Sequence, residues 1–137
     1  MQADLLKGIK IIDFTTYAAA PCSVRMLADW GADVIKVEGF SGDPMRAFGA
    51  NLGATPYTEE ENPVWEYENG NKRGIAVDLK TEKGMELMHK LLSEADAFVS
   101  NVRAGSLDKL GLSYEKLHER YPKLVVGVIS GYGLYGK

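Results

Sequence analysis

Residues 8–38 read GIKIIDFTTYAAAPCSVRMLADWGADVIKVE, and this stretch predicts one strand, one helix and a second strand of the βαβ kind. The nearly continuous apolar run over 9–14 is typical of a parallel strand that is buried on both faces. Pro21 fits the first position of the helix, and Gly31 fits the left-handed residue at its end. The apolar residues of 34–37 supply the second strand. We expect the rest of the chain to extend this unit.

The turn between the first strand and the helix, residues 15–20, is expected at the carboxyl edge of the sheet, where open α/β folds bind ligands. It contains no glycine. A dinucleotide site needs glycines there so that backbone N–H groups can approach a pyrophosphate, which excludes a standard NAD site. Three alanines still allow close approach to the unpaired N–H groups of a helix start, so a phosphate-bearing ligand fits.

The composition is that of one α/β domain, because 137 residues with 45% hydrophobic content suffice for a core. The formal charge of −3 gives no overall field that attracts nucleic acid. No apolar run approaches membrane-spanning length, and the amino terminus lacks the apolar region of a signal peptide. The single cysteine excludes an internal disulfide and offers no metal cluster. We therefore expect a cytoplasmic protein without nucleic-acid or membrane partners.

The remaining sequence alternates strands and helices after one long interruption. Residues 39–71 are rich in Gly, Pro, Asn and Glu and are expected to form a long loop, with short helical turns at 44–48 and 63–68 and a solvated glutamate run at 59–61. Beyond it we predict, in order, a strand at 74–77, a helix capped by Thr81 with Met85, Met88, Leu91 and Leu92 on its inner face, a strand at 97–99, short helices at 105–110 and 114–120, and a strand at 124–129.

This order predicts an α/β fold with a parallel sheet covered by helices. The sequence stops after a strand and a glycine-rich turn, where a helix normally follows, so we expect residues 1–137 to be the amino-terminal portion of a larger domain. Expressed alone, such a portion should expose an apolar patch and self-associate. The tail GYGLYG at 131–136 matches a dinucleotide fingerprint literally, but a plain glycine turn or another ligand loop is the commoner interpretation.

Cationic and polar residues flank the predicted third and fourth strands. They are Asn71, Lys72 and Arg73 before the third strand, Asp78, Leu79 and Lys80 after it, and Asn101, Val102 and Arg103 with Lys109 after the fourth. Because carboxyl ends of parallel strands share one edge, Lys80, Arg103 and Lys109 could converge on the turn at 15–20. Three cations there would suit a ligand with several phosphates. Ordinary surface charge is the alternative, and the residues alone leave both open.

Four further side chains have both a functional and a structural interpretation. Asp13 could be a catalytic carboxylate, although an acceptor for turn N–H groups is the commoner role. Cys22 lies in the first turn of a helix, where the dipole could lower its thiol pKa, but a small packed residue is the favoured interpretation. His89 and His118 lie on predicted amphipathic helices, where solvent-facing roles are favoured over catalysis.

Taken together, the motifs resemble the amino-terminal part of class III CoA-transferases, the family of formyl-CoA transferase, carnitine CoA-transferase and α-methylacyl-CoA racemase. The resemblance covers nearly the whole chain. It rests on LKGIKIIDFT at 6–15, MLADWGADVIKVE at 26–38, GDPMR at 42–46, NKRGIAVDLK at 71–80, the EAD, NVRAG and LGL segments within 94–112, and SGYGLYG at 130–136.

The resemblance implies a Rossmann-like parallel sheet with helices on both faces and an interlocked homodimer when full length. Its CoA contacts fall on Ala18, Ala19, Val77, Asp78, Leu79, Lys80, Asn101, Val102, Arg103 and Lys109. Gly39 departs from members with an arginine directly after the second-strand glutamate, which puts one adenosine or phosphate contact in doubt. CoA and acyl-CoA are implied as substrates, together with a small carboxylic acid, and no metal or tightly bound cofactor is implied.

In the family's transferases an aspartate attacks the thioester, forms a mixed anhydride and passes through an enzyme-bound CoA thioester. That aspartate would fall beyond the tail motif, so we assign no catalytic residue in this chain and expect the chain alone to be inactive. The first turn and tail resemble most the transferases of amino-acid fermentation that act on (R)-2-hydroxyacids such as 2-hydroxyisocaproate or phenyllactate. An α-methylacyl-CoA racemase and a noncatalytic nucleotide-binding module are the alternatives.

Overall fold

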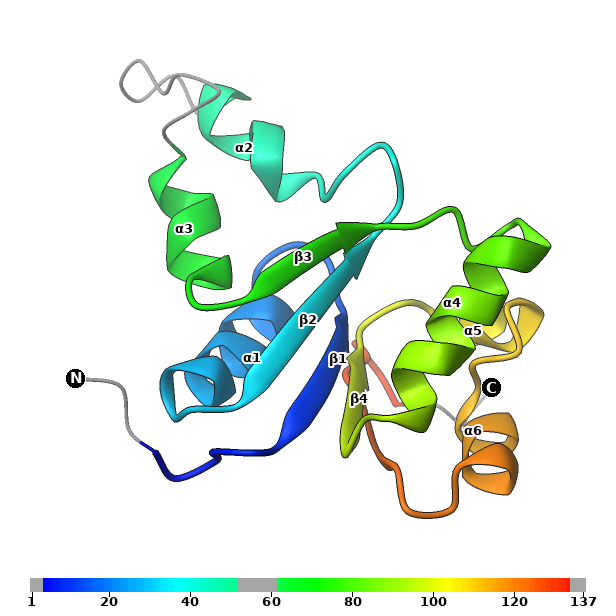
Figure 1. Ribbon diagram of the computed structural model, residues 1–137. Coiled ribbons are helices and arrows are strands. Elements are labelled where there is room, and N and C mark those ends of the chain that lie inside the picture. Colours follow the sequence, from blue (N-terminus) through cyan, green and yellow to red (C-terminus); the bar gives the residue numbers. More distant parts are fainter. Residues whose placement is uncertain (1–3, 52–61, 134–137) are drawn as a thin grey trace.

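The computed structural model describes residues 4–51 and 62–133. Within these residues it contains one five-stranded sheet in the order β3-β2-β1-β4-β5, with every neighbouring pair parallel (Figure 1). The strands are β1 (Lys10–Phe14), β2 (Asp33–Glu38), β3 (Arg73–Ala76), β4 (Ala97–Ser100) and β5 (Val125–Val128). This order is that of the first five strands of the Rossmann arrangement. The predicted α/β fold with a Rossmann-like parallel sheet is confirmed.

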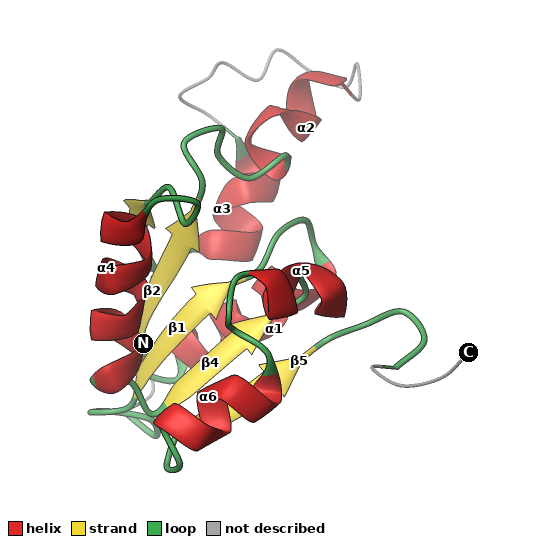
Figure 2. Cartoon of the chain, turned by 90° about the vertical axis from the view of Figure 1, so that its right-hand side faces the viewer, coloured by secondary structure: helices red, strands yellow, loops and turns green. Residues whose placement is uncertain are grey.

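Helices cover both faces of the sheet, as predicted (Figure 2). One face carries α1 (Ala19–Asp29), and the other carries α4 (Glu82–Ser93), α5 (Ala104–Lys109) and α6 (Tyr114–Arg120). Successive side chains of a strand point to opposite faces. Ile11 therefore packs into the core under α1, whereas Ile12 packs into the core under the other three helices.

The core beneath α4, α5 and α6 is the larger of the two. Its buried residues are Ile12, Val37, Val77, Leu79, Met88, Leu92, Phe98, Leu107, Leu112, Leu117 and Leu124. The core beneath α1 contains the buried residues Ile11, Val24, Ala28, Ala32 and Val34. The predicted inner face of α4 is confirmed, because Met88 and Leu92 are buried and Met85 and Leu91 pack against them.

The segment predicted as a long loop contains two helices in its described parts. They are α2 (Met45–Asn51) and α3 (Pro63–Asn69), so the helical turns predicted there are confirmed and run further than expected. Asn62 caps α3 by accepting a hydrogen bond from Trp65 N (3.0 Å). Its amide nitrogen also donates to Met45 O and Arg46 O (2.9 and 2.8 Å), which ties α2 to α3. The glutamate run at 59–61 lies outside the described residues.

The boundaries of α1 differ from the prediction at one end only. The helix begins at Ala19 with Ala18 as N-cap, so Pro21 is the third residue of the helix. The prediction that Pro21 is the first residue was wrong. Proline is tolerated throughout the first turn because those N–H groups have no acceptor within the helix. Gly31 adopts a φ of 100° just after the helix, as predicted.

The edge strand β5 carries exposed apolar side chains. Val125 is 67% exposed, and Ile129 and Tyr132 beyond the strand are 39% and 103% exposed. In the described part of the chain β5 pairs only with β4 (Figure 2). Unpaired strand edges and exposed apolar side chains favour association, so self-association of the isolated chain stays a prediction. The tail motif at 131–136 lies partly outside the described residues.

Candidate functional site

The strand order reverses between β1 and β4, which is the place where doubly wound folds bind ligands. We call the carboxyl ends of these two strands the switch point. The side chain of Asn101, directly after β4, spans it. Its Oδ1 accepts a hydrogen bond from Thr16 N (2.9 Å), and its Nδ2 donates to Thr16 O (2.7 Å). The turn after β1 and the turn after β4 are therefore held side by side.

The predicted contacts Ala18 and Ala19 form the start of α1 beside this junction, and both are exposed. Alanine has no side-chain oxygen that could accept hydrogen bonds from the first-turn N–H groups, and the first turn carries no acidic residue. Such a helix start attracts an anion through its N–H groups and its dipole. The absence of glycine in this turn does not close it to a phosphate.

The predicted cations Arg103 and Lys109 mark the two ends of α5. Arg103 is the N-cap and Lys109 the last residue, and both side chains are exposed. Among the described residues neither side chain has a hydrogen bond or ion pair, so their predicted role as ligand contacts stays a prediction. Val102 is half-buried, and its N–H donates to Ser100 Oγ (3.1 Å). A cavity of about 280 Å³ adjoins α5 and is lined in part by Ala104, Leu107, Asp108, Tyr114 and Val128.

The third predicted group follows β3 and lies further along the same edge. Val77 and Leu79 are only 5% and 9% exposed and pack in the core, so they offer a ligand backbone groups alone. Asp78 accepts a hydrogen bond from Lys80 N (3.0 Å), which shapes the turn. Three strand spacings of about 4.8 Å separate β3 from β4, or about 14 Å in all. Arg103 thus lies at the switch point, and Lys80 lies towards the far end of the edge.

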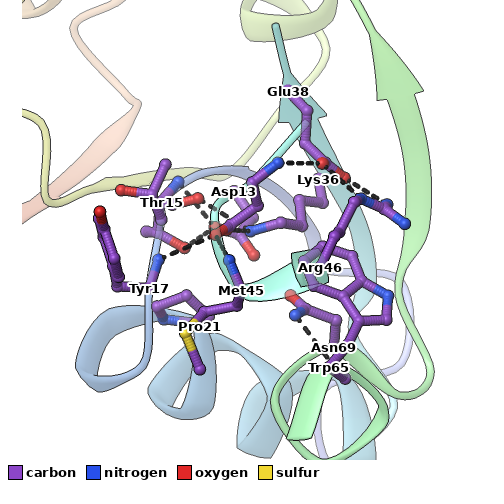
Figure 3. A network of polar contacts seen from close by, with 12 residues as sticks. Asp13, Thr15, Tyr17, Pro21, Lys36, Glu38, Met45, Arg46, Trp65 and Asn69 are labelled. Atoms are coloured by element: carbon purple, nitrogen blue, oxygen red, sulfur yellow. Dashed lines mark hydrogen bonds and ion pairs between the residues drawn. The ribbon is translucent and has the colours of Figure 1, made fainter. Parts of the chain in front are cut away.

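A buried network of charged side chains lies on the α1 face behind the switch point (Figure 3). Lys72 Nζ donates to Asp13 Oδ2 (2.8 Å), and Lys36 Nζ forms an ion pair with Asp43 Oδ2 (3.1 Å). All four side chains are at most 2% exposed. Asp13 and Lys36 are direct partners in the β1–β2 register. They lie on the α1 face of the sheet, nearer its carboxyl edge than Ile11, which packs on the same face.

The rim of this network is formed by Glu38 at the end of β2. Arg46 binds its carboxylate through two N–H groups (2.8 and 2.7 Å), and Asp43 N donates to the same group (2.9 Å). Burial alone would raise the pKa of Glu38, but these hydrogen bonds lower it below its ordinary value. The Arg46 guanidinium lies 3.8 Å from the centre of the Trp65 ring, which fixes α3 beside α2.

Sequence reasoning missed this network, because it listed Lys72 only among the cations that flank the third strand and left ligand binding and ordinary surface charge both open. β3 is staggered, so its first residue, Arg73, pairs with Ile35 in the middle of β2. Lys72 therefore lies within reach of the interior instead of at the sheet's rim. A signal was present in Lys36, a lysine between apolar residues of a buried strand, because a buried charge needs a partner.

The other candidate side chains have structural roles. Asp13 accepts hydrogen bonds from Thr15 N (3.1 Å) and Thr15 Oγ1, which confirms its predicted role as an acceptor for the turn. Its side chain is fully buried, so it is not accessible to a substrate. Burial, followed by the nearby Glu68, raises the pKa of Cys22. A raised thiol pKa favours the packed, unreactive interpretation.

The histidines lie away from the switch point. His89 is half-buried, with Nδ1 at 3.1 Å from Tyr121 Oη, and burial followed by Arg120 lowers its pKa. The ring of His89 is partly open to solvent and partly covered by Tyr121. His118 is exposed and stacks on Tyr114.

Glu68 is a member of the buried cluster whose carboxylate lacks full compensation. It is 3% exposed, and its Oε2 has no hydrogen-bond partner among the described residues. Burial and then the charge of Asp43 raise the pKa of Glu68. A carboxyl group whose pKa is raised in the folded state does not change the free energy of unfolding at pH values below its ordinary pKa, because it is protonated in both states there. As the pH rises above that value, the group lowers the free energy of unfolding increasingly.

We therefore expect Glu68→Gln to increase the free energy of unfolding by about 1 kcal/mol at pH 8 and to have little effect at pH 4. Urea unfolding at both pH values measures this difference. Glu66→Gln, an exposed position on the same helix, serves as the control and should change stability by less than about 0.5 kcal/mol. Equal destabilisation by Glu68→Gln at both pH values would contradict the assignment.

No group of three or more His, Cys, Asp or Glu side chains among the described residues is arranged to hold a metal ion. No helix in the described part is long and apolar enough to cross a membrane.

Comparison with known proteins matches residues 6–137 to the family model described as CoA-transferase family III. The chain belongs to this family. It is 46% identical over 132 residues to (R)-2-hydroxy-4-methylpentanoate CoA-transferase of Clostridioides difficile and 44% identical over 135 residues to cinnamoyl-CoA:phenyllactate CoA-transferase of Clostridium sporogenes. These matches cover 96% and 98% of this chain but only 33% and 32% of the relatives, so the chain spans about a third of their length.

Solved structures of the family share the fold. A CAIB/BAIF family protein from Brucella suis superposes with a TM-score of 0.86 at 37% identity, over 96% of this chain and 35% of that one. The D175A mutant of Rv3272 from Mycobacterium tuberculosis superposes with a TM-score of 0.82 at 32% identity, over 100% and 36%. The resemblance to class III CoA-transferases drawn from the motifs is confirmed.

Proposed function

We propose that residues 1–137 form the CoA-binding portion of a class III CoA-transferase, which moves CoA between an acyl-CoA and a carboxylic acid. The observation that carries the proposal is the junction of Thr16 and Asn101 at the switch point. On one side of it lies the open start of α1, and on the other lies the guanidinium of Arg103, which has no partner among the described residues. A diphosphate placed between them would meet backbone N–H groups and a bidentate cation.

The remaining predicted contacts extend this site in both directions. Lys109 lies at the far end of α5, and Lys80 lies beyond β3 on the same edge of the sheet. Lysines bind phosphate as point charges, so these two suit phosphate groups of a long ligand better than a single small anion. The proposed set is Ala18, Ala19, Val77, Asp78, Leu79, Lys80, Asn101, Val102, Arg103 and Lys109.

The acid that accepts CoA is proposed to be a 2-hydroxyacid of amino-acid fermentation. The names of two similar relatives support this choice, because they specify 2-hydroxy-4-methylpentanoate and phenyllactate. The proposed reaction begins with attack of an aspartate carboxylate on the thioester carbonyl, which releases the CoA thiolate and leaves a mixed anhydride. The thiolate then attacks the aspartyl carbonyl and expels the first acid. The acceptor carboxylate attacks the aspartyl carbonyl and expels the CoA thiolate, which forms a new mixed anhydride. The thiolate then attacks the acyl carbon of the acceptor and releases the aspartate carboxylate.

We assign the nucleophilic aspartate to sequence outside this chain. Of the aspartates near the switch point, Asp13 and Asp43 are fully buried and paired with lysines. The full-length protein is proposed to be a cytoplasmic, interlocked homodimer, and the isolated chain is proposed to be inactive. Neither the racemase nor the noncatalytic module is favoured, because the relatives described above are named as CoA-transferases.

Isothermal titration of CoA into the full-length protein tests the site. Arg103→Ala and Lys109→Ala should each weaken CoA binding about tenfold, the loss of one charge-assisted hydrogen bond. Lys123→Ala is the matched control, since Lys123 is exposed and precedes β5 at the opposite edge of the sheet. Unchanged affinity in both site variants would remove these residues from the site. Tighter binding of NADH than of CoA would favour the noncatalytic module.

A further inference from the structure

Tyr17 has a strained backbone at the switch point. It lies between Thr16, which Asn101 holds, and Ala18, the N-cap of α1. Its φ is 60°, in the left-handed region that residues other than glycine rarely adopt. Such strain persists only where surrounding contacts enforce it, and it occurs preferentially at functional sites.

The Lys36–Asp43 pair enforces the conformation of Tyr17 from beneath. Asp43 Oδ1 accepts a hydrogen bond from Tyr17 N (3.2 Å), while Lys36 Nζ donates to Thr15 O (2.8 Å). The pair thus holds the backbone of the turn on both sides of Thr16. Asp43 is itself fixed, because its own N–H donates to Glu38 (2.9 Å) and its Oδ1 also accepts from Met45 N (3.0 Å).

The Tyr17 side chain points away from the buried network (Figure 3). It is 55% exposed, and among the described residues its hydroxyl has no hydrogen-bond partner. Packing within the described chain therefore does not explain why a large aromatic residue occupies a strained position. An aromatic ring with a polar tip is suited to contact a ligand that is partly apolar.

We propose that Tyr17 contacts the acyl thioester portion of the bound acyl-CoA and that Asp43 is the positioning residue that holds Tyr17 there. This inference rests on the proposed CoA-transferase function. The charged portion of the ligand is drawn to Arg103 and the start of α1. The uncharged ring beside them is left for the uncharged acyl end of the same molecule. Asp43 lies after β2, so a segment distant from the turn sets the geometry of the site.

Steady-state kinetics of the full-length protein with an acyl-CoA donor test the contact. Tyr17→Gly should raise the KM for acyl-CoA about tenfold, the effect of losing one buried aromatic contact. It should leave the melting temperature equal or higher, because glycine adopts a positive φ without strain. Tyr67→Ala removes an exposed tyrosine on α3 and should not change the KM. An unchanged KM in Tyr17→Gly would overturn the proposal.

The role of Asp43 is tested by a double-mutant cycle in KM. Asp43→Ala should raise the KM about as much as Tyr17→Gly does, and should add less than about twofold in the Tyr17→Gly background, because coupled residues are not additive. Equal effects of Asp43→Ala in both backgrounds would show a merely structural role.

If Asp43→Ala does not fold, Asp43→Asn takes its place. It retains an acceptor oxygen for Tyr17 N, so its KM should stay within about threefold of the unmodified protein, and a tenfold rise would contradict positioning through that bond.

The proposed function fails separately from this inference. If calorimetry shows that the unmodified full-length protein does not bind CoA, the proposed function is wrong and the inference falls with it. If the protein binds CoA and transfers it but Tyr17→Gly has an unchanged KM, only the inference is wrong.

Discussion

Replacing Lys72 by methionine is expected to lower the free energy of unfolding by about 3–5 kcal/mol, because it leaves Asp13 buried without its counter-charge. Lys72 Nζ donates to Asp13 Oδ2 (2.8 Å), Pro21 O (2.9 Å) and Asn69 Oδ1 (3.0 Å). Methionine keeps an unbranched apolar stem but donates no hydrogen bond, so all three acceptors lose a partner. These acceptors lie on β1, α1 and α3, so the loss of the three hydrogen bonds should loosen both helices from the sheet. Urea unfolding measures the change.

Two further variants make this result specific. Lys116→Met breaks the Lys116–Asp108 pair, which has a similar distance (2.9 Å) but is 51% and 65% exposed, and it should cost less than about 1 kcal/mol. Asp13→Asn combined with Lys72→Met removes both charges and should recover much of the lost stability. Asparagine keeps an acceptor for Thr15 N. A loss below about 1 kcal/mol for Lys72→Met alone would show that this pair is not important for stability.

Gly84→Ala is expected to destabilise the chain by about 3 kcal/mol, because a buried position with no space must accept a methyl group. A Cβ at Gly84 would lie 2.0 Å from Asp78 O and 2.7 Å from Asp78 C, and both are backbone atoms that cannot rotate away. The first turn of α4 packs directly on the Asp78–Lys80 turn, where Thr81 Oγ1 caps Gly84 N (3.1 Å). The turn must therefore shift, and CoA binding by the full-length protein should weaken as well.

Gly105→Ala is the matched control for this prediction. Gly105 also lies in a helix, α5, but a Cβ there would meet no atom within 4 Å. Because alanine is the better helix former, this change should be neutral or stabilising by up to about 1 kcal/mol. Chemical unfolding of both variants separates a steric effect from a general intolerance of glycine substitution. Similar stabilities for the two variants would contradict the close approach of α4 to Asp78.

The part of the candidate site that follows strand ends could be predicted from the sequence. Asn101 and the start of α1 are neighbours because β1 and β4 are neighbours, and a carboxyl-edge position follows from a parallel sheet. The burial of Val77 and Leu79 could not be predicted in the same way, because the predicted strand included Val77 whereas β3 ends at Ala76 and leaves both residues in the turn that follows it. Their burial depends on how α4 returns over the sheet.

The buried charges show the limit of local reasoning more clearly. Lys72 follows Asn71 and precedes Arg73, and three polar residues in a row are typical of a surface. Arg73 is indeed exposed and pairs with Asp33 (2.7 Å). Only the stagger of β3 against β2 turns the side chain between these neighbours towards Asp13.

From the sequence it was possible to predict the class of fold, the approximate extent of the helices and strands, the family and the edge of the sheet at which a ligand is expected. These follow from the spacing of apolar residues and from short motifs, which are local properties of the chain. The tertiary structure alone decided that Lys72 binds Asp13, 59 residues away, and that Asp43 fixes the strained backbone of Tyr17. A charge in the interior must find a partner wherever strand register and helix packing place one, and no local pattern carries that information.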